Sequence, residues 1–437
     1  MTTDALPDQL AIRPVAQPLH AVVRVPGSKS LTNRALIVAA LADGHTRLRD
    51  ALFSDDSRYC AEALSALGFA VTRDAAAQTV DITGQGGRLP ADRAELFVGN
   101  AGTAARFLTV LLTLGQGDYV LDGNARMRER PLDDLLSALT QLGATVESDT
   151  GCPPVRVRAA GLPGGRATVG GEVSSQFLSG LLLSAPYAQS PVELVVAGTL
   201  NSAPYVDLTL GVMADFGVTV ERDGYARFRV TPQRYTARPE YVIEGDASAA
   251  SYFFAAPAIA GGTVCVANLS RAARQGDVAF VDVLAQMGCR VTEIGGGLAV
   301  SAPAGGQLRG VDVDLRHIPD TAQTLAAVAP FANSPTRIRG IASARRKETD
   351  RVTAMCVELQ RLGVAVDEHT DGLTIYPAES LTPAVIQTYD DHRMAMAFAL
   401  VGLRAPGVVI DNPGCVSKTF PDYFAVLESL RPSSNRT

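Results

Sequence analysis

The chain of 437 residues lacks several features that mark whole classes of protein. It has no tryptophan and only 6% aromatic residues, so a platform for stacking nucleic-acid bases is not expected. Its net charge of −6 argues against a nucleic-acid or anionic-membrane surface, which requires a broad basic field. Its longest apolar runs are too short to cross a bilayer. We therefore expect neither a nucleic-acid nor a membrane partner.

Cysteine pairs and a targeting segment are also missing. The six cysteines are scattered, form no C-x-x-C pair and lie near no histidine pair, so we expect neither a disulfide framework nor a metal site. The N-terminal residues show neither the basic region nor the apolar region of a signal peptide. These features predict a cytoplasmic protein without a metal ion.

Lysine is unusually rare, because only three of the 39 basic residues are lysines. They are Lys29, Lys347 and Lys418, and each lies in a segment rich in small, hydroxyl or charged residues. Lysine is a compact, strongly hydrated point charge, whereas arginine is a planar fork. A composition bias would explain the rarity, but we favour a functional role for the lysines that remain.

What the chain does have is an internal repeat. An apolar helical stretch, a terminating glycine and an alternating strand recur along it, with glycines at Gly68, Gly143, Gly217, Gly288 and Gly363. Successive spacings are 75, 74, 71 and 75, and a truncated sixth copy, FPDYFAVLESL, follows. A long fixed period predicts repeated supersecondary units, each with an amphipathic helix that ends at glycine.

Six such units suit two α/β domains of three units each. Small-residue breaks at 26–28 and 244–248 are the best crossover points. The sequence therefore predicts a continuous domain at 27–245 and a discontinuous one at 1–26 plus 246–437. We expect the active site in a cleft between the two domains.

Polar motifs precede several apolar helices in the first half of the chain. In PGSKSLTNRAL, Lys29, Ser30 and Arg34 lie where free N–H groups attract anions, although the spacing excludes a Walker P-loop. In GNAGTAARF, a tight turn at Asn100 and Gly102 repeats this design. The alternative for each motif is an ordinary helix cap with solvated charges.

Further first-half motifs carry arginine or neutral donors. In RMRERP, an extended backbone would place Arg126, Arg128 and Arg130 on one side; a solvated loop is the alternative. The segments SSQFLSGLL and NSAPYVDL offer hydroxyl and amide groups suited to a polyhydroxylated or phosphorylated ligand.

The second half adds carboxylates to the cations. Asp320 directly precedes an apolar helix, where an N-cap is the default interpretation. Lys347 and Arg351 are spaced to share a helix face, with Glu348 beside them. His392 and Arg393 open another helix. Together these motifs predict a strongly electropositive pocket for an anion with several charges, with Asp320 and Glu348 as acid and base candidates.

In their order along the chain, PGSKSLTNRAL, GNAGTAARF, RMRERP, SSQFLSGLL, IPDTAQTLA, KETDRV, DDHRMAMA and KTFPDYF resemble the EPSP synthases (3-phosphoshikimate 1-carboxyvinyltransferases). These enzymes belong to the enolpyruvyl transferase family, and the resemblance covers essentially the full length. It implies two domains, each of three βαβαββ units around a pseudo-threefold axis in an inside-out α/β barrel. It also implies transfer of the enolpyruvyl group of phosphoenolpyruvate to the 5-hydroxyl of shikimate 3-phosphate, in aromatic amino-acid biosynthesis.

The resemblance also assigns residues. Those implied to bind shikimate 3-phosphate are Lys29, Ser30, Arg34, Ser174, Ser175, Gln176, Ser202, Tyr205, Asp320, Ser343 and Lys347. Those implied to bind phosphoenolpyruvate are Lys29, Asn100, Gly102, Thr103, Arg126, Gln176, Arg351, Arg393 and Lys418. Asp320 would handle the 5-hydroxyl proton and Glu348 the proton at C3, with Lys29 and His392 assisting. No cofactor is implied, and a monomer is expected.

Two positions depart from the pattern of many family members. Ser343 replaces an asparagine before the lysine of KETDRV, and Phe107 replaces a proline after the motif arginine Arg106. The second change bears on the inhibitor glyphosate, since a bulkier residue there would shift the helix and Gly102.

Two other functions are alternatives. One is the sister transferase acting on UDP-N-acetylglucosamine, which typically has a reactive cysteine in a mobile loop; the RMRERP loop has none. The other is a non-catalytic phosphometabolite-binding protein. The carboxylates of Asp320 and Glu348 argue against it, because anion binding gains nothing from them.

Overall fold

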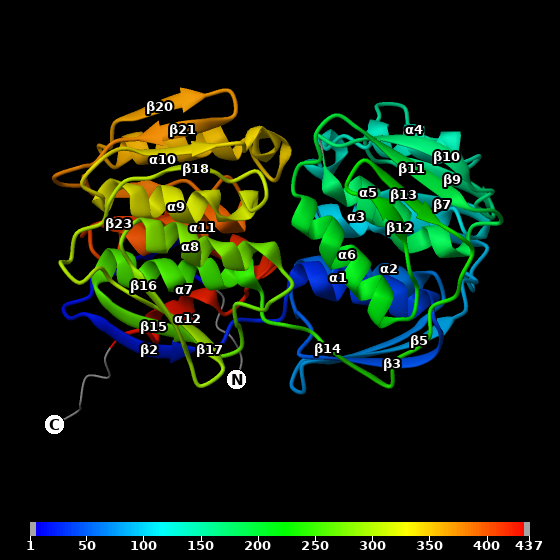
Figure 1. Ribbon diagram of the computed structural model, residues 1–437, viewed down its shortest axis with the longest axis horizontal. Coiled ribbons are helices and arrows are strands. Elements are labelled where there is room, and N and C mark those ends of the chain that lie inside the picture. The colour runs from blue at the N-terminus through cyan, green and yellow to red at the C-terminus, as the bar shows by residue number, and fades with distance from the viewer. Residues whose placement is uncertain (1–5, 173, 432–437) are drawn as a thin grey trace. The chain divides into compact units, whose positions relative to one another are not determined.

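The computed structural model describes residues 6–172 and 174–431 (Figure 1). It divides into two compact units, one formed by Met1–Pro26 with Gly245–Thr437 (unit 1) and the other by Gly27–Glu244 (unit 2). The second boundary falls one residue before the one expected from the sequence. Residues 1–5, which the expected discontinuous domain includes, lie outside the described ranges.

Unit 2 contains three four-stranded sheets among its described residues, in the orders β14-β3-β5-β4, β6-β7-β9-β8 and β10-β11-β13-β12. Their strands are β3 (Asp43–Arg49), β4 (Ala70–Asp74), β5 (Thr79–Gln85), β6 (Arg93–Phe97), β7 (Gln116–Asp122), β8 (Thr145–Glu147), β9 (Val155–Ala160), β10 (Gly165–Gly170), β11 (Val192–Ala197), β12 (Glu221–Asp223), β13 (Arg227–Val230) and β14 (Glu240–Val242). The helices are α1 (Lys29–Leu41), α2 (Asp55–Ala66), α3 (Gly102–Leu112), η1 (Met127–Glu129), α4 (Asp133–Gln141), α5 (Ser175–Ser184), η2 (Ala185–Tyr187) and α6 (Ala203–Asp215), where η marks a 3₁₀ helix.

Unit 1 repeats this plan with sheets β16-β17-β15-β2, β18-β19-β21-β20 and the three-stranded β1-β23-β22. Its strands are β1 (Gln9–Ala11), β2 (Leu19–Val23), β15 (Gly262–Val266), β16 (Arg290–Ile294), β17 (Gly297–Ser301), β18 (Asp312–Asp314), β19 (Thr336–Arg339), β20 (Val366–His369), β21 (Gly372–Ile375), β22 (Ala384–Ile386) and β23 (Val408–Asp411). Its helices are α7 (Ala247–Ala260), η3 (Gly276–Ala279), α8 (Phe280–Gln286), η4 (Pro319–Thr321), α9 (Ala322–Val328), η5 (Ala329–Phe331), η6 (Ala342–Arg346), α10 (Arg351–Arg361), α11 (His392–Val401), η7 (Pro413–Lys418) and α12 (Tyr423–Glu428).

The predicted repeat is visible in the strand order. In the unit β6-α3-β7-α4-β8-β9, the first two strands are parallel, and β9 pairs antiparallel with both β7 and β8. The other four-stranded sheets show the same arrangement, and β22 and β23 begin a truncated sixth copy. The expected α/β fold of βαβαββ units is confirmed.

The predicted glycine termini are also present. Gly68, Gly143, Gly217, Gly288 and Gly363 all have positive φ, between 79° and 105°, just after α2, α4, α6, α8 and α10. Only glycine adopts this conformation without strain, which explains why it recurs at the ends of these helices.

Two classes of helix alternate in each repeat. Nearly every residue of α1, α3 and α5 is buried in unit 2, and the same holds for α7, α9 and α11 in unit 1. The alternate helices, such as α4 and α10, expose one face. Figure 1 shows α7, α9 and α11 between the sheets of unit 1. We call these buried helices the central helices. Because a central helix packs on all sides, its polar residues gather near its ends.

Candidate active site

The first motif lies where the sequence predicted it, at the start of a central helix. Helix α1 begins at Lys29, and the hydroxyl of the N-cap Ser28 accepts a hydrogen bond from Leu31 N. Lys29 Nζ lies 3.5 Å from Asp56 Oδ2, a buried carboxylate in the first turn of α2. Lys29 and Ser30 therefore occupy a helix N-terminus, where backbone N–H groups favour anions.

Arg34 joins three helices of unit 2. Its guanidinium is buried and donates to Thr209 Oγ1 at 2.8 Å, Ser30 O at 2.8 Å, Tyr205 O at 3.0 Å and Ser179 Oγ at 3.3 Å. All four acceptors are uncharged. Burial lowers the pKa of Arg34 to about 10, against a smaller opposing effect of Tyr205.

A second group surrounds the start of α3. Arg130 Nη1 donates to the backbone oxygen of Asn100 at 3.1 Å and to its side-chain oxygen at 2.9 Å. Gln176 Nε2 donates to Thr103 Oγ1 at 3.2 Å. A Cβ on Gly102 would approach the guanidinium of Arg130 within 2.4 Å, so a larger residue here would displace that side chain. These contacts bring four of the predicted residues together.

The extended backbone considered for RMRERP does not occur. Met127–Glu129 form the 3₁₀ helix η1, so the three arginines do not line one side of an extended strand. Arg126 pairs with Glu129 at 2.7 Å, and its side chain is 36% exposed. Arg128 donates to Asp122 at 3.0 Å. Arg130 is buried and contacts Asn100.

The hydroxyl motifs lie at the starts of two further helices. Ser174 is the N-cap of α5, and its side chain accepts a hydrogen bond from Gln176 N. Ser175 is the first residue of α5. Ser202 is the N-cap of α6 and has positive φ, 57°. These residues and Tyr205 belong to unit 2. The polar motifs of this unit described above lie at or near the starts of helices.

The predicted site residues of unit 1 include Arg351, the first residue of α10, which contacts three carboxylates. Its guanidinium binds Asp391 through Nε at 2.7 Å, Asp320 through Nη1 at 3.1 Å and Glu348 through Nη2 at 2.8 Å. The side chains of Arg351, Glu348 and Asp391 are 2%, 7% and 0% exposed. Burial opposes the charged form of Arg351, but the three carboxylates outweigh it and raise its pKa.

Asp320 links Arg351 to a second arginine. Its other oxygen accepts from Arg393 Nη2 at 2.6 Å, and Arg393 Nη1 donates to Tyr252 OH at 3.4 Å. The default assignment of Asp320 as an N-cap is therefore wrong, since it lies within η4 and Thr321 caps α9. The carboxylate bridges two cations instead.

The two lysines of unit 1 lie at the ends of 3₁₀ segments. Lys418 is the last residue of η7, and its Nζ lies 3.8 Å from Glu348 Oε1. Lys347 follows η6, which contains Ser343, and α10 begins only at Arg351. The helix face expected to be shared by Lys347 and Arg351 is thus wrong, because Asp350 caps α10 between them.

Carboxylates accompany the cations of this group. Arg351, Arg393 and Lys418 each contact at least one of the carboxylates Asp320, Glu348 and Asp391. Carboxylates are chemically able to act as acid or base groups.

The comparisons with known proteins agree with one another. The sequence model of the EPSP synthase (3-phosphoshikimate 1-carboxyvinyltransferase) family matches residues 15–427. The chain belongs to the EPSP synthase family.

Relatives in that family align over most of their length. A 3-phosphoshikimate 1-carboxyvinyltransferase of Nostoc punctiforme is 50% identical over 420 residues, covering 95% of this chain and 98% of that protein. A chloroplastic one of Brassica napus is 46% identical, covering 98% of this chain and 86% of that protein. The solved structure of EPSP synthase from Acinetobacter baumannii has a TM-score of 0.79 at 24% identity, covering 97% and 98% of the two chains, and supports the fold alone.

The sequence interpretation missed several residues that the family motifs contain. Asp391 and Arg130 both lie inside segments that had been recognised, DDHRMAMA and RMRERP, but nothing in their spacing showed their partners. Tyr252 lies in an apolar helix and carries no motif; burial raises its pKa to about 12, against an opposing effect of Arg393. A further buried group, Asp246, Ser248, Gln275 and Asp277, joins the start of α7 to η3.

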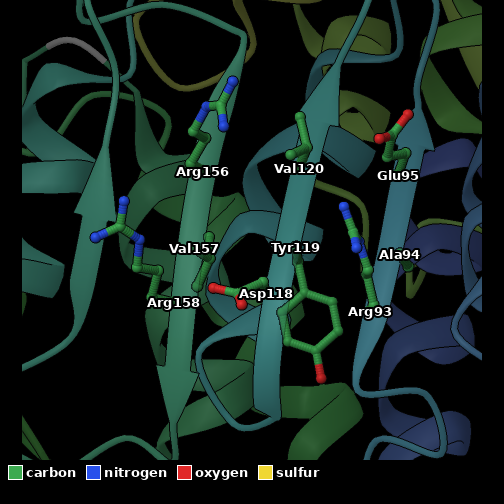
Figure 2. Close-up of a pocket in the computed structure, with 9 residues that line it drawn as sticks. All are labelled: Arg93, Ala94, Glu95, Asp118, Tyr119, Val120, Arg156, Val157 and Arg158. Carbon is green, nitrogen blue, oxygen red and sulfur yellow. The ribbon is translucent and has the colours of Figure 1, made fainter.

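An open depression of about 460 Å³ lies elsewhere, on the outer face of sheet β6-β7-β9 (Figure 2). Arg93, Asp118 and Arg158 occupy one row of paired residues across its strands. Oppositely charged side chains that alternate across a sheet are typical of a solvated face. None of the predicted site residues lines this depression.

Neither a metal nor a membrane feature appears in residues 6–172 and 174–431. No group of three or more His, Cys, Asp or Glu residues there is arranged to hold a metal ion. None of the helices in these ranges is long and apolar enough to cross a membrane.

Proposed function

We propose that the chain transfers the enolpyruvyl group of phosphoenolpyruvate to the 5-hydroxyl of shikimate 3-phosphate, releasing phosphate. Family membership and the names of its relatives support this activity. The same matches favour it over the transferase acting on UDP-N-acetylglucosamine. The observation that carries it within the site is the buried group in which Arg351 and Arg393 contact Asp320, with Glu348 beside Arg351.

The reaction proceeds by an addition step followed by an elimination step. The 5-hydroxyl oxygen bonds to C2 of phosphoenolpyruvate and gives up its proton, while C3 gains a proton to become a methyl group. The resulting tetrahedral intermediate then breaks its C2–phosphate bond, and C3 loses a proton to restore the double bond. A site for this chemistry needs anion binding together with acid and base groups.

We assign the acid and base roles to the carboxylates of unit 1. Asp320 would accept the 5-hydroxyl proton, and Glu348 would deliver and remove the proton at C3. Both contact adjacent nitrogens of one guanidinium, which orients them. Arg351, Arg393 and Lys418 would bind phosphoenolpyruvate, since arginine forks match carboxylate and phosphate oxygens.

We assign shikimate 3-phosphate chiefly to unit 2. Lys29, Ser30 and Arg34 lie together at the start of α1, and Arg34 is bound to Tyr205 O. The hydroxyls of Ser174, Ser175 and Ser202 suit a phosphorylated, hydroxylated ring. The proposal thus requires each unit to contribute to the same substrate pair.

One residue joins those expected from the sequence. Arg130 contacts Asn100 and lies beside Gly102. We propose that Arg130 acts together with Arg126, Asn100 and Gly102 in binding phosphoenolpyruvate.

Phe107 is buried, and its ring centroid lies 5.2 Å from the guanidinium carbon of Arg34. A cation over an aromatic ring is a favourable contact. We propose that Phe107 supports Arg34 here, so that its effect on glyphosate would be exerted through the shikimate 3-phosphate side as well as through Gly102.

The six thiols are free, which suits the cytoplasm proposed for this enzyme, and we propose a monomer that needs no cofactor. Phosphate release is the decisive assay. Purified protein should release phosphate from phosphoenolpyruvate with shikimate 3-phosphate, and not with UDP-N-acetylglucosamine. The reverse result would favour the sister activity, and binding without release would favour a non-catalytic binding protein.

A further inference from the structure

The turn before α11 has a strained backbone. Tyr389 and Asp390 have φ values of 55° and 54°, and neither is glycine. Each non-glycine residue in this region costs on the order of 1–3 kcal/mol unless the surroundings enforce it. The next residue, Asp391, binds the side chain of Arg351 and the backbone N–H of Arg393. The strained turn therefore determines where a buried carboxylate and two arginines lie.

Glu358 holds this turn from α10. Its side chain is fully buried and accepts from Tyr389 OH at 2.7 Å, from Gln387 N at 3.1 Å and from Arg361 Nε at 3.3 Å. A buried carboxylate is tolerated only when its oxygens are satisfied in this way. Two of these donors belong to the turn region, since Gln387 lies just before the turn and Tyr389 lies in it.

Helix α10 contacts the turn through two side chains. Arg351 binds Asp391, and Glu358, seven residues later on the same helix face, binds Tyr389. These two contacts flank Asp390, whose carboxylate accepts from Asn412 at 3.3 Å. A turn fixed on both sides to one rigid helix can retain an unfavourable backbone conformation.

We propose that Glu358 and Tyr389 are positioning residues for the binding of phosphoenolpyruvate. They hold the strained turn so that Asp391 orients Arg351 and the start of α11 orients Arg393. Neither residue is among those assigned to contact substrate, and the inference rests on the proposed function. Burial and Glu358 raise the pKa of Tyr389 to about 12, and its hydroxyl donates to Glu358.

The sharpest test is Tyr389→Phe, which removes one hydroxyl and keeps the ring. We expect the KM for phosphoenolpyruvate to rise about tenfold, with kcat much less affected, because a hydrogen bond to a charged acceptor is lost outside the reacting groups. Tyr376→Phe is the matched control. Tyr376 OH also donates to a carboxylate, Asp367, at 2.7 Å, in the β20–β21 hairpin away from this turn.

A second pair of variants separates positioning from folding. Glu358→Gln keeps an acceptor for Tyr389 and should retain more affinity for phosphoenolpyruvate than Glu358→Ala. An unchanged KM in Tyr389→Phe, or equal changes in Tyr389→Phe and Tyr376→Phe, would overturn the proposal. If the wild-type protein releases no phosphate, the proposed function fails instead. Calorimetric affinity for phosphoenolpyruvate alone, in the same variants, then still decides the positioning role.

Discussion

Two buried arginines, Arg34 of unit 2 and Arg351 of unit 1, have opposite surroundings. Arg34 is held by hydroxyl and backbone oxygens, whereas Arg351 is held by three carboxylates. Burial lowers the pKa of Arg34, while the carboxylates overcome burial and raise that of Arg351. We propose that the two arginines serve different purposes. A cation with neutral partners keeps its charge for an anionic ligand, and a cation with carboxylates orients acid and base groups.

Lys29 differs from Arg34 in lying beside a carboxylate, Asp56. Lys29→Arg should break this pattern by replacing a compact ammonium with a planar fork. We expect turnover to fall by about 10⁴-fold or more while the fold persists, since binding and proton transfer would both lose their geometry. Steady-state phosphate release and circular dichroism measure the two effects. Arg166→Lys, on the exposed side of β10, is the control. Near-normal kcat in Lys29→Arg would contradict a special role for lysine.

Removing each arginine tests the comparison directly. Arg351→Met should destabilise the protein by about 3–5 kcal/mol, because it leaves buried carboxylates without their cation. Arg34→Met should cost only about 1 kcal/mol, since Thr209 still donates to Ser179 and Tyr205 O. Urea unfolding followed by circular dichroism measures both losses.

The pKa shift of Arg34 also predicts how the stability lost in Arg34→Met depends on pH. A basic group whose pKa is lowered on folding binds fewer protons in the folded state, so its charge opposes folding at any pH below about 10. Arg34→Met removes that penalty, and its loss of stability should therefore stay small throughout neutral pH. Equal losses in the two variants would mean that the surroundings of these arginines do not differ in energy.

Glu348→Gln probes the carboxylate side of the comparison. Glutamine keeps the shape and still accepts from Arg351, but it cannot deliver a proton. We expect kcat to fall by about 10²–10³-fold with calorimetric binding of shikimate 3-phosphate nearly unchanged. Exchange of solvent deuterium into the methylene group of phosphoenolpyruvate should stop. Normal exchange would remove Glu348 from the mechanism, and lost binding would make its role structural.

The smallest expected effect concerns the thiols. Burial raises the pKa of Cys60 in unit 2 and of Cys415 in unit 1 to about 12, so little reactive thiolate exists at pH 8. Iodoacetamide should modify mainly Cys152, which is half-buried, and activity should change by less than about twofold. Peptide mass spectrometry after labelling identifies the modified residues. If the loss of activity instead followed the modification of one thiol, the result would favour the sister transferase, which typically has a reactive cysteine.

Local signals in the sequence were sufficient for the repeat. The helices before Gly68, Gly143 and Gly363 follow from apolar periodicity and a residue that alone accepts positive φ. The starts of α1, α3, α5 and α11 follow equally from small or polar residues before an apolar run. These features depend on neighbours within a few positions, which is the range over which a pattern is informative.

Side-chain partners were not predictable, because they join distant segments. Asp320 resembles an N-cap locally, yet it binds Arg351 and Arg393, 31 and 73 residues away. The spacing of Lys347 and Arg351 suggests a shared face, but a cap at Asp350 restarts the helix between them. Arg126 and Arg130 are the same residue type in one short motif, and only the packing shows that Arg130 is buried and Arg126 is half-buried.

The pairing of β1 with β23 has a consequence for biosynthesis. Gln9 lies opposite Asp411. Strand β2 pairs with β15, although all residues of unit 2 lie between these two strands in the sequence. As the chain leaves the ribosome, residues 27–244 can complete their own core while the first strands still lack partners. We expect unit 2 to fold as an isolated fragment. A stable fragment of unit 1 should require a circular permutation that joins its N-terminal strands to the rest.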